Sequence, residues 1–269
     1  MALEDAVYDI IGKKYKNLQY QEEPVTVQHL ITHTSGLPLN IQGVSELYQI
    51  PNSNNYFKAQ EILANYSKEE LLLEIQSVRL TQKPGEGYSY SNVAPNLIAH
   101  ILEIVYNKPF EQLLKEKLFI PAKMTRTHIN LDDRQQTFLA NGYNEDNKLM
   151  PNFKKPIQLW GAAGRIKSNS EDLLNYIKWQ LNNRNADVKL SHKKLFYDVD
   201  NIWIGCYWEV IEDDTSYHIE HHGGIYGSQN WLMIYPEHNI GISIITNASF
   251  PQANQLIKET ANKIINRLK

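Results

Sequence analysis

The sequence has one cysteine, no long apolar run and no excess of basic charge. The single cysteine, Cys206, excludes an internal disulfide, and its apolar neighbours favour a small buried side chain. A membrane helix needs roughly 20 consecutive apolar residues, so no membrane span is expected. The net charge of −3 offers no basic surface for nucleic acid. The first residues lack the apolar segment that defines a signal peptide.

What the chain does have is enough apolar material for a sizeable core. Of its 269 residues, 42% are hydrophobic, which suits one large domain or two closely packed lobes. The charged residues are scattered, as expected of solvated helix faces rather than a binding patch.

Apolar residues recur at helical spacing in the first two thirds of the chain. Thr26 is a suitable N-cap residue for a short helix predicted over 26–35, which stops at Gly36. Further helices are predicted over 58–76, 92–106 and 109–119. Ser168 and Glu171 have the spacing of a capping box, which predicts that Ser168 opens the next helix.

After residue 200 the apolar period changes to two, which indicates strands. Strands are expected over 203–210, 217–221, 229–235 and 241–247. Turns at 212–214 and 236–239 would join them as hairpins, and an amphipathic helix is expected over 249–269. Helices followed by an antiparallel sheet with a covering helix predict an α+β fold.

Several motifs occur in an order that resembles a known family. Residues 25–38 include Thr-His-Thr-Ser-Gly-Leu-Pro, 84–92 end in Tyr-Ser-Asn, 121–124 read Pro-Ala-Lys-Met and 161–164 read Gly-Ala-Ala-Gly. The stretch 221–247 begins His-His-Gly-Gly and ends in Thr-Asn. Together they resemble the penicillin-recognising serine hydrolases, in the branch of class C β-lactamases, DD-peptidases and related esterases.

The resemblance implies the fold and its division into lobes. We expect one β-lactamase-like unit over 1–269, with a mainly helical lobe over about 24–190 and an antiparallel sheet with a C-terminal helix over about 191–269. In the family a Ser-x-x-Lys motif precedes the segment that 25–38 resembles, and the chain has no such motif there. The nucleophilic serine, its lysine and the N-terminal part of the sheet lobe are therefore expected to be missing. An oligomer or a swapped segment could complete the fold.

The resemblance also assigns roles to residues that are present. Tyr90 matches the family tyrosine, which acts as a base only where cations lower its pKa from about 10. Asn92 would hydrogen-bond a substrate amide and hold the lysine. His221 opens the third motif, Gly223 lets substrate lie close to the strand, and the N–H of Gly224 is an oxyanion donor.

Histidine at position 221 bears on the substrate. A lysine would be a permanent cation for a β-lactam carboxylate, whereas histidine, with a pKa near 6.5, is mostly neutral at pH 7. We therefore expect an esterase, DD-peptidase or D-amino-acid peptidase acting on a small-molecule or peptide substrate, rather than an efficient β-lactamase. The alternative is a non-catalytic protein that binds a ligand in the ancestral cleft.

Other histidines and serines have simpler interpretations. His29 and His33 lack the glutamate that a zinc helix would carry between them, and His218 and His222 lack further ligands, so neither a metal nor a cofactor is expected. Ser35 is expected to satisfy backbone groups near a helix end. Ser191 begins a Ser-x-x-Lys sequence, but it lies in a polar stretch far after Tyr90 and is not expected to be the nucleophile. Members of the family often work in the periplasm or outside the cell.

Overall fold

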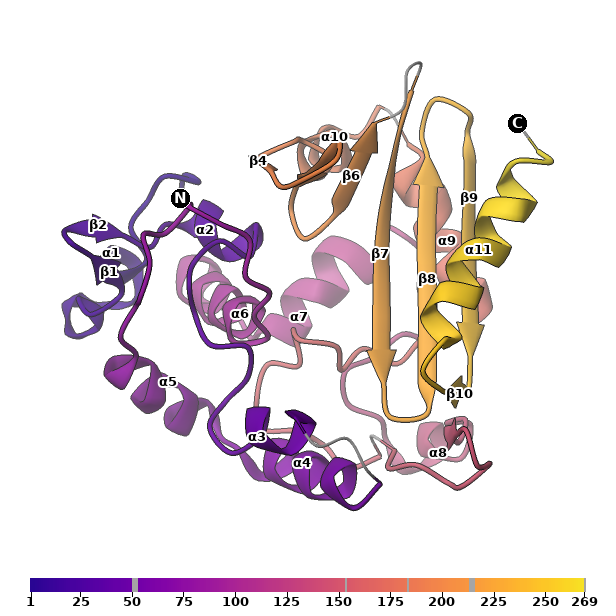
Figure 1. Cartoon of the computed structure of the whole chain (residues 1–269), viewed down its shortest axis with the longest axis horizontal. Helices are drawn as coiled ribbons and strands as arrows, with labels where there is room; N and C mark the ends of the chain where they lie inside the picture. Colours follow the sequence, from indigo (N-terminus) through magenta and orange to yellow (C-terminus); the bar gives the residue numbers. More distant parts are fainter. Residues whose placement is uncertain (50–52, 153, 183, 213–215, 269) are drawn as a thin grey trace. The chain divides into compact units, whose positions relative to one another are not determined.

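The computed structural model describes residues 1–49, 53–152, 154–182, 184–212 and 216–268. The chain, whose helices and strands are labelled in Figure 1, divides into two compact units, and each unit consists of two separate stretches of sequence. The first unit comprises Met1–Leu114 and Lys155–Arg165, and the second comprises Lys115–Lys154 and Ile166–Lys269. The lobes predicted over 24–190 and 191–269 stay a prediction.

The first unit is mainly helical. Its helices are α1 (Val7–Ile11), the 3₁₀ turn η1 (Lys13–Tyr15), α2 (Val27–Ile31), α3 (Ser45–Gln49), α4 (Ser53–Asn65), α5 (Lys68–Ser77), α6 (Val93–Tyr106) and α7 (Phe110–Leu114). Two short antiparallel strands, β1 (Gln19–Tyr20) and β2 (Glu23–Pro24), form a ribbon. Helix α6 packs against α1 and α2, with Leu30, Leu97 and Ile101 fully buried.

Local capping explains where these helices begin. Thr26 caps α2 as predicted: its hydroxyl accepts the N–H of His29 at 3.4 Å, and the His29 ring accepts the N–H of Thr26 at 3.1 Å. The single helix predicted over 58–76 is wrong, because Ser67 and Glu70 form a second capping box that starts α5 after α4 has ended. The helix predicted over 92–106 is confirmed as α6.

The second unit carries the large sheet. Its helical segments are the π turn η2 (Lys115–Phe119), α8 (Asp133–Gln136), α9 (Ser170–Gln180), α10 (Ala186–Ser191) and α11 (Ala253–Ile265). Six antiparallel strands follow one another in sheet order: β4 (Phe196–Tyr197), β5 (Ile202–Ile204), β6 (Glu209–Glu212), β7 (Tyr217–Ile225), β8 (Ser228–Tyr235) and β9 (Ile240–Thr246). A short parallel pair joins β3 (Tyr143–Asn144) to β10 (Ala248–Ser249).

The strands confirm the predicted period but not every boundary. The strand predicted over 203–210 is wrong, because the chain turns after Gly205 and Tyr207 adopts a left-handed conformation (φ 63°) between β5 and β6. The strand predicted to end at 221 continues as far as Ile225 in β7. The turn predicted over 212–214 falls largely on 213–214, outside the described residues.

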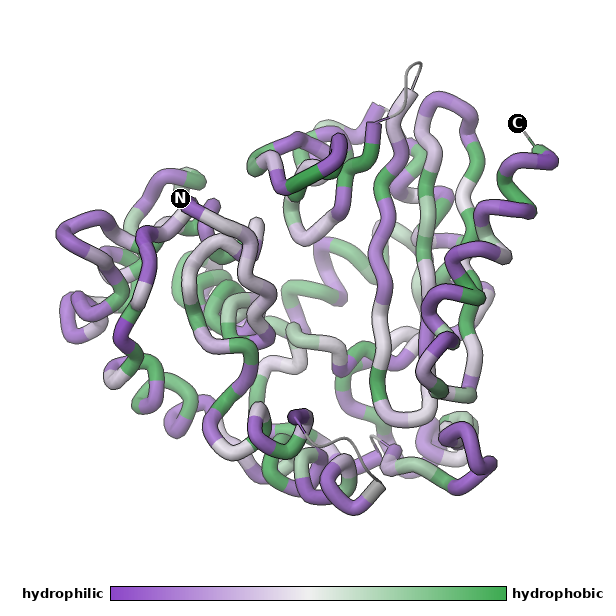
Figure 2. Tube along the Cα trace, viewed as in Figure 1, coloured by the Kyte–Doolittle hydropathy of each residue, from purple (hydrophilic) through white to green (hydrophobic). Residues whose placement is uncertain are grey.

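Helices cover both faces of this sheet. On one face α11 packs against β8 and β9, where Trp231, Met233, Tyr235, Ile257, Ala261 and Ile265 form a cluster. On the other face α9 approaches β9 so closely that a Cβ at Gly241 would lie 2.4 Å from Cγ2 of Ile177. Hydrophobic and hydrophilic segments alternate along α11 (Figure 2), as its covering position requires. The predicted α+β class, with an antiparallel sheet flanked by helices, is confirmed.

The start of α9 corrects one prediction. Asn169, not Ser168, is its N-cap residue, and the Asn169 side chain accepts the N–H of Asp172 at 3.1 Å. The Ser168 hydroxyl instead shares a 2.8 Å hydrogen bond with Thr127. The hydrogen bond to Thr127 thus replaces the capping bond that sequence spacing had predicted for Ser168.

Within the described ranges, every helix is too short or too polar to cross a lipid bilayer.

Candidate active site

The Tyr90-Ser91-Asn92 segment lies in the first unit, where the chain enters α6. Ser91 is fully buried, and its hydroxyl donates to the carbonyl of Pro38 at 2.6 Å. The same oxygen accepts the N–H groups of Val93 and Ala94 at 3.1 and 3.2 Å. Ser91 therefore caps the helix and ties it to the loop after residue 37, which fixes the direction in which its two neighbours leave the backbone.

Asn92 is held by two consecutive residues of that loop. Its N–H donates to the carbonyl of Leu39 at 2.7 Å, and its side-chain amide donates to Oδ1 of Asn40 at 2.8 Å. The Oδ1 atom of Asn92 has no hydrogen-bond partner among the described residues, so it remains available as an acceptor. Sequence reasoning missed Asn40; its place just after Leu37-Pro38 in the motif is the only signal that could have marked it.

The ring of Tyr90 packs against the buried ring of His33. The two ring centroids are 4.4 Å apart, and Nδ1 of His33 accepts the N–H of Ser91 at 3.2 Å. His33 has a left-handed backbone (φ 55°), and its carbonyl accepts the N–H of Ser89 at 2.7 Å. The Thr-His-Thr-Ser segment is thus a support for the tyrosine, which sequence reasoning had treated only as a signature.

The environment of Tyr90 keeps its phenol protonated. Its side chain is 43% exposed, and partial burial raises the pKa of Tyr90 above its usual value. A tyrosine acts as a base only when neighbouring cations stabilise the phenolate. Within the first unit as described, burial opposes that role, so a cation must approach Tyr90 before the phenol can serve as a base.

Two residues of the same segment have the structural roles predicted for them. His29 caps α2, and burial lowers its pKa, which favours the neutral ring. Ser35 is fully buried, and its Oγ accepts the N–H of Leu37 at 3.3 Å. A hydroxyl enclosed in this way cannot reach a substrate.

The Ser-x-x-Lys sequence at 191–194 does not have the arrangement of a nucleophile. Ser191 is the last residue of α10, and its hydroxyl donates to the carbonyl of Val188 at 2.8 Å. Lys194 forms an ion pair with Glu212. The serine ends a helix instead of opening one, and its lysine is engaged on the sheet.

The other part of the predicted site lies in the second unit, on β7. His221 lies opposite Leu232 of β8, and the Trp208 ring meets its ring edge-on at 6.4 Å. Burial, and secondly the charge of His222, lower the pKa of His221, so the imidazole is neutral at physiological pH.

Beyond Glu220, β7 has an open edge on the side of β6. Strand β6 pairs with β7 only from Glu212↔Tyr217 to Glu209↔Glu220. In the sheet as described, His221–Ile225 therefore pairs with β8 alone. An open edge offers backbone groups to an extended ligand.

Gly223 and Gly224 lie within this open stretch. They pair with Asn230 and Gln229 of β8, and Gly224 is exposed. A Cβ at Gly224 would lie 2.6 Å from Oε1 of Gln229, and this oxygen accepts a hydrogen bond from Nε2 of His222 at 2.8 Å. Glycine leaves room beside the backbone for both this side chain and a ligand.

The remaining histidines of β7 lie on the opposite face from His221. His218 stacks on Tyr235 at 4.6 Å, and His222 packs on Trp231 at 4.9 Å. Both aromatic residues belong to the cluster beneath α11. Among the residues that the structure describes, no group of three His, Cys, Asp or Glu side chains could hold a metal ion.

The structure thus gathers the predicted residues into two sets. Tyr90 and Asn92 share one rigid segment of the first unit, and His221, Gly223 and Gly224 share one strand of the second. A helical unit and a helix-covered antiparallel sheet, each carrying one set, define the β-lactamase and transpeptidase class of fold. The model of the Beta-lactamase family matches residues 1–265, and the chain belongs to this family.

Known relatives agree with that membership. The protein flp of Staphylococcus aureus is 24% identical over 255 residues, which cover 93% of this chain and 48% of that protein. A structure of the octameric penicillin-binding protein homologue from Pyrococcus abyssi has a TM-score of 0.73 at 22% identity, covering 93% of this chain and 57% of that one. A β-lactamase/D-alanine carboxypeptidase from Yersinia pestis, complexed with citrate, has a TM-score of 0.77 at 20% identity, covering all of this chain and 77% of that one. The chain spans about half the length of the curated relatives that it matches.

Proposed function

We propose that these residues carry the second and third motifs of a serine hydrolase that cleaves an ester or an amide. The nucleophilic serine and its lysine would come from a segment outside the 269 residues. The observation that carries the proposal is Asn92, whose side chain is fixed by Asn40 while its Oδ1 stays free to accept a hydrogen bond.

Each residue would have a defined task in such a reaction. A lysine ammonium bound to Oδ1 of Asn92 would supply the cation that lowers the pKa of Tyr90 and lets the phenolate take the serine proton. The serine would attack the acyl carbon, and the N–H of Gly224 would stabilise the oxyanion together with the N–H of the serine. The open edge of β7 would align the substrate beside Gly223.

His221 supports an esterase, DD-peptidase or D-amino-acid peptidase rather than an efficient β-lactamase. Burial lowers its pKa, so it is not a permanent cation for the carboxylate of a β-lactam. A neutral imidazole can still donate a hydrogen bond to an uncharged acyl substrate or accept one from it.

An acylating probe tests the proposal. A fluorophosphonate or a labelled penicillin should leave this chain unmodified and should label a longer polypeptide that also contains the upstream Ser-x-x-Lys motif. In the longer protein, Tyr90→Phe should reduce labelling by at least about a hundredfold, the usual contribution of a general base. Labelling of the present chain that disappears in Ser35→Ala or Ser191→Ala would overturn the assignment.

A non-catalytic binding protein is the second candidate. Burial raises the pKa of Tyr90, which favours a phenol that donates a hydrogen bond to a ligand over one that acts as a base. This candidate predicts that a peptide or acyl ligand raises the melting temperature of this chain without being turned over. A longer polypeptide that also fails to react with either probe would favour this candidate over the hydrolase.

A further inference from the structure

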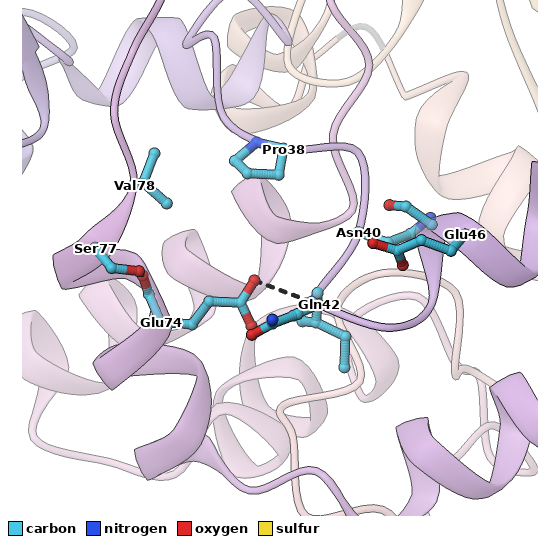
Figure 3. Close-up of a pocket in the computed structure, with 9 residues that line it drawn as sticks. Pro38, Asn40, Gln42, Glu46, Glu74, Ser77 and Val78 are labelled. Atoms are coloured by element: carbon cyan, nitrogen blue, oxygen red, sulfur yellow. Dashed lines mark hydrogen bonds between the residues drawn. The ribbon is translucent and has the colours of Figure 1, made fainter.

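A cavity of about 360 Å³ lies in the first unit, close to the residue that holds Asn92 (Figure 3). The loop over 38–42, the start of α3 and the end of α5 form its walls, and Asn40, Glu46 and Glu74 contribute polar groups. Its volume falls within the range of small-molecule sites. None of the roles proposed above for Tyr90, Asn92 or His221 uses this cavity.

Glu74 is held in place by two donors. Its Oε1 accepts the N–H of Gln42 at 3.0 Å, and its Oε2 accepts the hydroxyl of Tyr66. Burial, and next the hydrogen bond to Glu74, raise the pKa of Tyr66, so the phenol keeps the proton that it donates. The carboxylate is therefore fixed before any ligand arrives, which reduces the entropy lost on binding.

Among the described residues, the two carboxylates of the cavity have no cationic partner. Neither Glu46 nor Glu74 forms an ion pair with a described Lys, Arg or His side chain. Figure 3 shows Glu46 beside Asn40, and Glu74 on the other side of Gln42. Two uncompensated negative charges in a concave site attract a cation more strongly than the same charges on a convex surface.

Asn40 provides the cavity with a hydrogen-bond donor. The residue is 8% exposed, and its Oδ1 accepts from Asn92, which fixes the plane of the side-chain amide. Its amide nitrogen has no hydrogen-bond partner among the described residues and is accessible rather than enclosed. Because Asn40 lines the cavity, these N–H groups can donate to the carbonyl or hydroxyl of an occupant.

We propose that this cavity binds the ammonium group of a small organic cation, such as a lysine-like side chain of a peptide, between Glu46 and Glu74. Asn40 donates to a carbonyl oxygen of the same molecule and connects the occupant to Asn92. A divalent metal is a poorer match, because two carboxylates supply too few of the six to eight oxygen ligands that calcium requires. That the cation belongs to the substrate rests on the proposed hydrolase function; its binding to this cavity does not.

A titration followed by ¹H–¹⁵N NMR tests the site in the chain as it stands. The probe is Nα-acetyl-lysine methylamide, and its uncharged counterpart is Nα-acetyl-norleucine methylamide. The lysine compound should shift the side-chain amide resonances of Asn40 and Asn92, and its affinity should fall as the salt concentration rises. Equal affinity for the norleucine compound, or unchanged Asn40 resonances, would overturn the proposal.

Matched variants separate the site from general charge effects. Glu46→Gln and Glu74→Gln should each weaken binding about three- to tenfold, whereas Glu69→Gln, an exposed residue of α5 outside the cavity, should not. Glu74→Gln also disturbs Tyr66 and Gln42, so Glu46→Gln is the deciding variant. Equal loss in Glu69→Gln would refute the site, as would calcium chloride that competes with the probe for the same resonances. Neither measurement needs a nucleophile, so this result and the acyl-labelling result can fail separately.

Discussion

At the scale of single residues, the charge state of a buried ionisable group in the second unit is set by a few neighbouring side chains. Glu220 is fully buried, and Lys258 on α11 donates to its Oε1 at 2.6 Å. Burial by itself would raise the pKa of Glu220, but the hydrogen bonds and charges of His218 and Lys258 outweigh it and lower the pKa. The carboxylate is therefore charged in the folded protein, and the Lys258–Glu220 ion pair ties α11 to β7.

Lys258→Met should destabilise the protein by about 3 kcal/mol, because it removes the lysine partner of a buried carboxylate. Urea unfolding followed by circular dichroism measures the loss. Lys263→Met is the control, since Lys263 is exposed on the same helix and is in no ion pair among the described residues. If both variants lose the same stability, the ion pair with Glu220 is not the cause.

His192 should make the protein sensitive to acid. It is buried against Gln180, and burial lowers its pKa to about 4 from the ordinary 6.5. The unfolded chain takes up a proton near pH 6.5, whereas the folded chain does so only near pH 4. The stability that depends on the neutral ring is thus complete above pH 6.5 and is lost as the pH falls towards 4.

His192→Gln should remove up to about 3 kcal/mol of the stability loss between those two pH values. Unfolding free energies measured across that pH range test the expectation, with His238→Gln, an exposed turn residue, as the control. An unchanged pH slope in His192→Gln would show that other groups cause the acid sensitivity.

At the scale of elements, end signals decide where helices begin. Three side chains set the starts of α2, α5 and α9: Thr26, Ser67 and Asn169. In each case a side-chain oxygen accepts an N–H group that the helix itself leaves free. Ser168 has equally good sequence spacing for α9, but it bonds to Thr127, which is 41 residues away in sequence.

Asn169→Ala should therefore cost about 1 kcal/mol of unfolding free energy, the usual value of a lost N-cap. Ser170→Ala, at the adjacent exposed position, should change stability by only a few tenths of that amount. Thermal unfolding of the two variants measures the difference. Equal effects would mean that Asn169 does not cap α9.

At the scale of the whole molecule, the large sheet ends in an unprotected strand. Strand β9 has seven residues, Ile240–Thr246, and none of them is charged. It is the last strand of the described sheet, and Ile245 is 49% exposed. Exposed uncharged edge strands pair readily with other strands, so we expect the isolated chain to self-associate.

Ile245→Lys should shift the chain towards monomers, because a lysine on the edge opposes pairing with a second strand. Size-exclusion chromatography with light scattering measures the mass across a concentration series. Leu73→Lys, which changes an exposed apolar residue in the first unit, is the control. A wild-type chain that stays monomeric at all concentrations would refute the expectation.

The sequence by itself determined the class of fold and the order of its elements. The change from helical to strand period near residue 200 and the ordered motifs predicted an α+β member of the Beta-lactamase family. These signals are local: they depend on side-chain alternation and on caps within three or four residues. The break at Ser67 also has a local signal, the capping-box spacing of Ser67 and Glu70, which the helix predicted over 58–76 overlooked. The turn inside 203–210 has a weaker one, because Tyr207 adopts a left-handed conformation that its residue type does not favour.

Only the tertiary structure decided how the candidate site is supported. The support of Tyr90 by His33, the bond from Asn92 to Asn40 and the open edge of β7 join residues that are distant in sequence. Periodicity and spacing describe neighbours along the chain. Contacts such as these arise only when separate segments compete for the same buried hydrogen-bonding groups in the folded protein. Residue types and motif order therefore predicted Tyr90, Asn92 and His221 as site residues. Packing determined which of their atoms form hydrogen bonds or ring contacts within the described residues and which are available to a ligand.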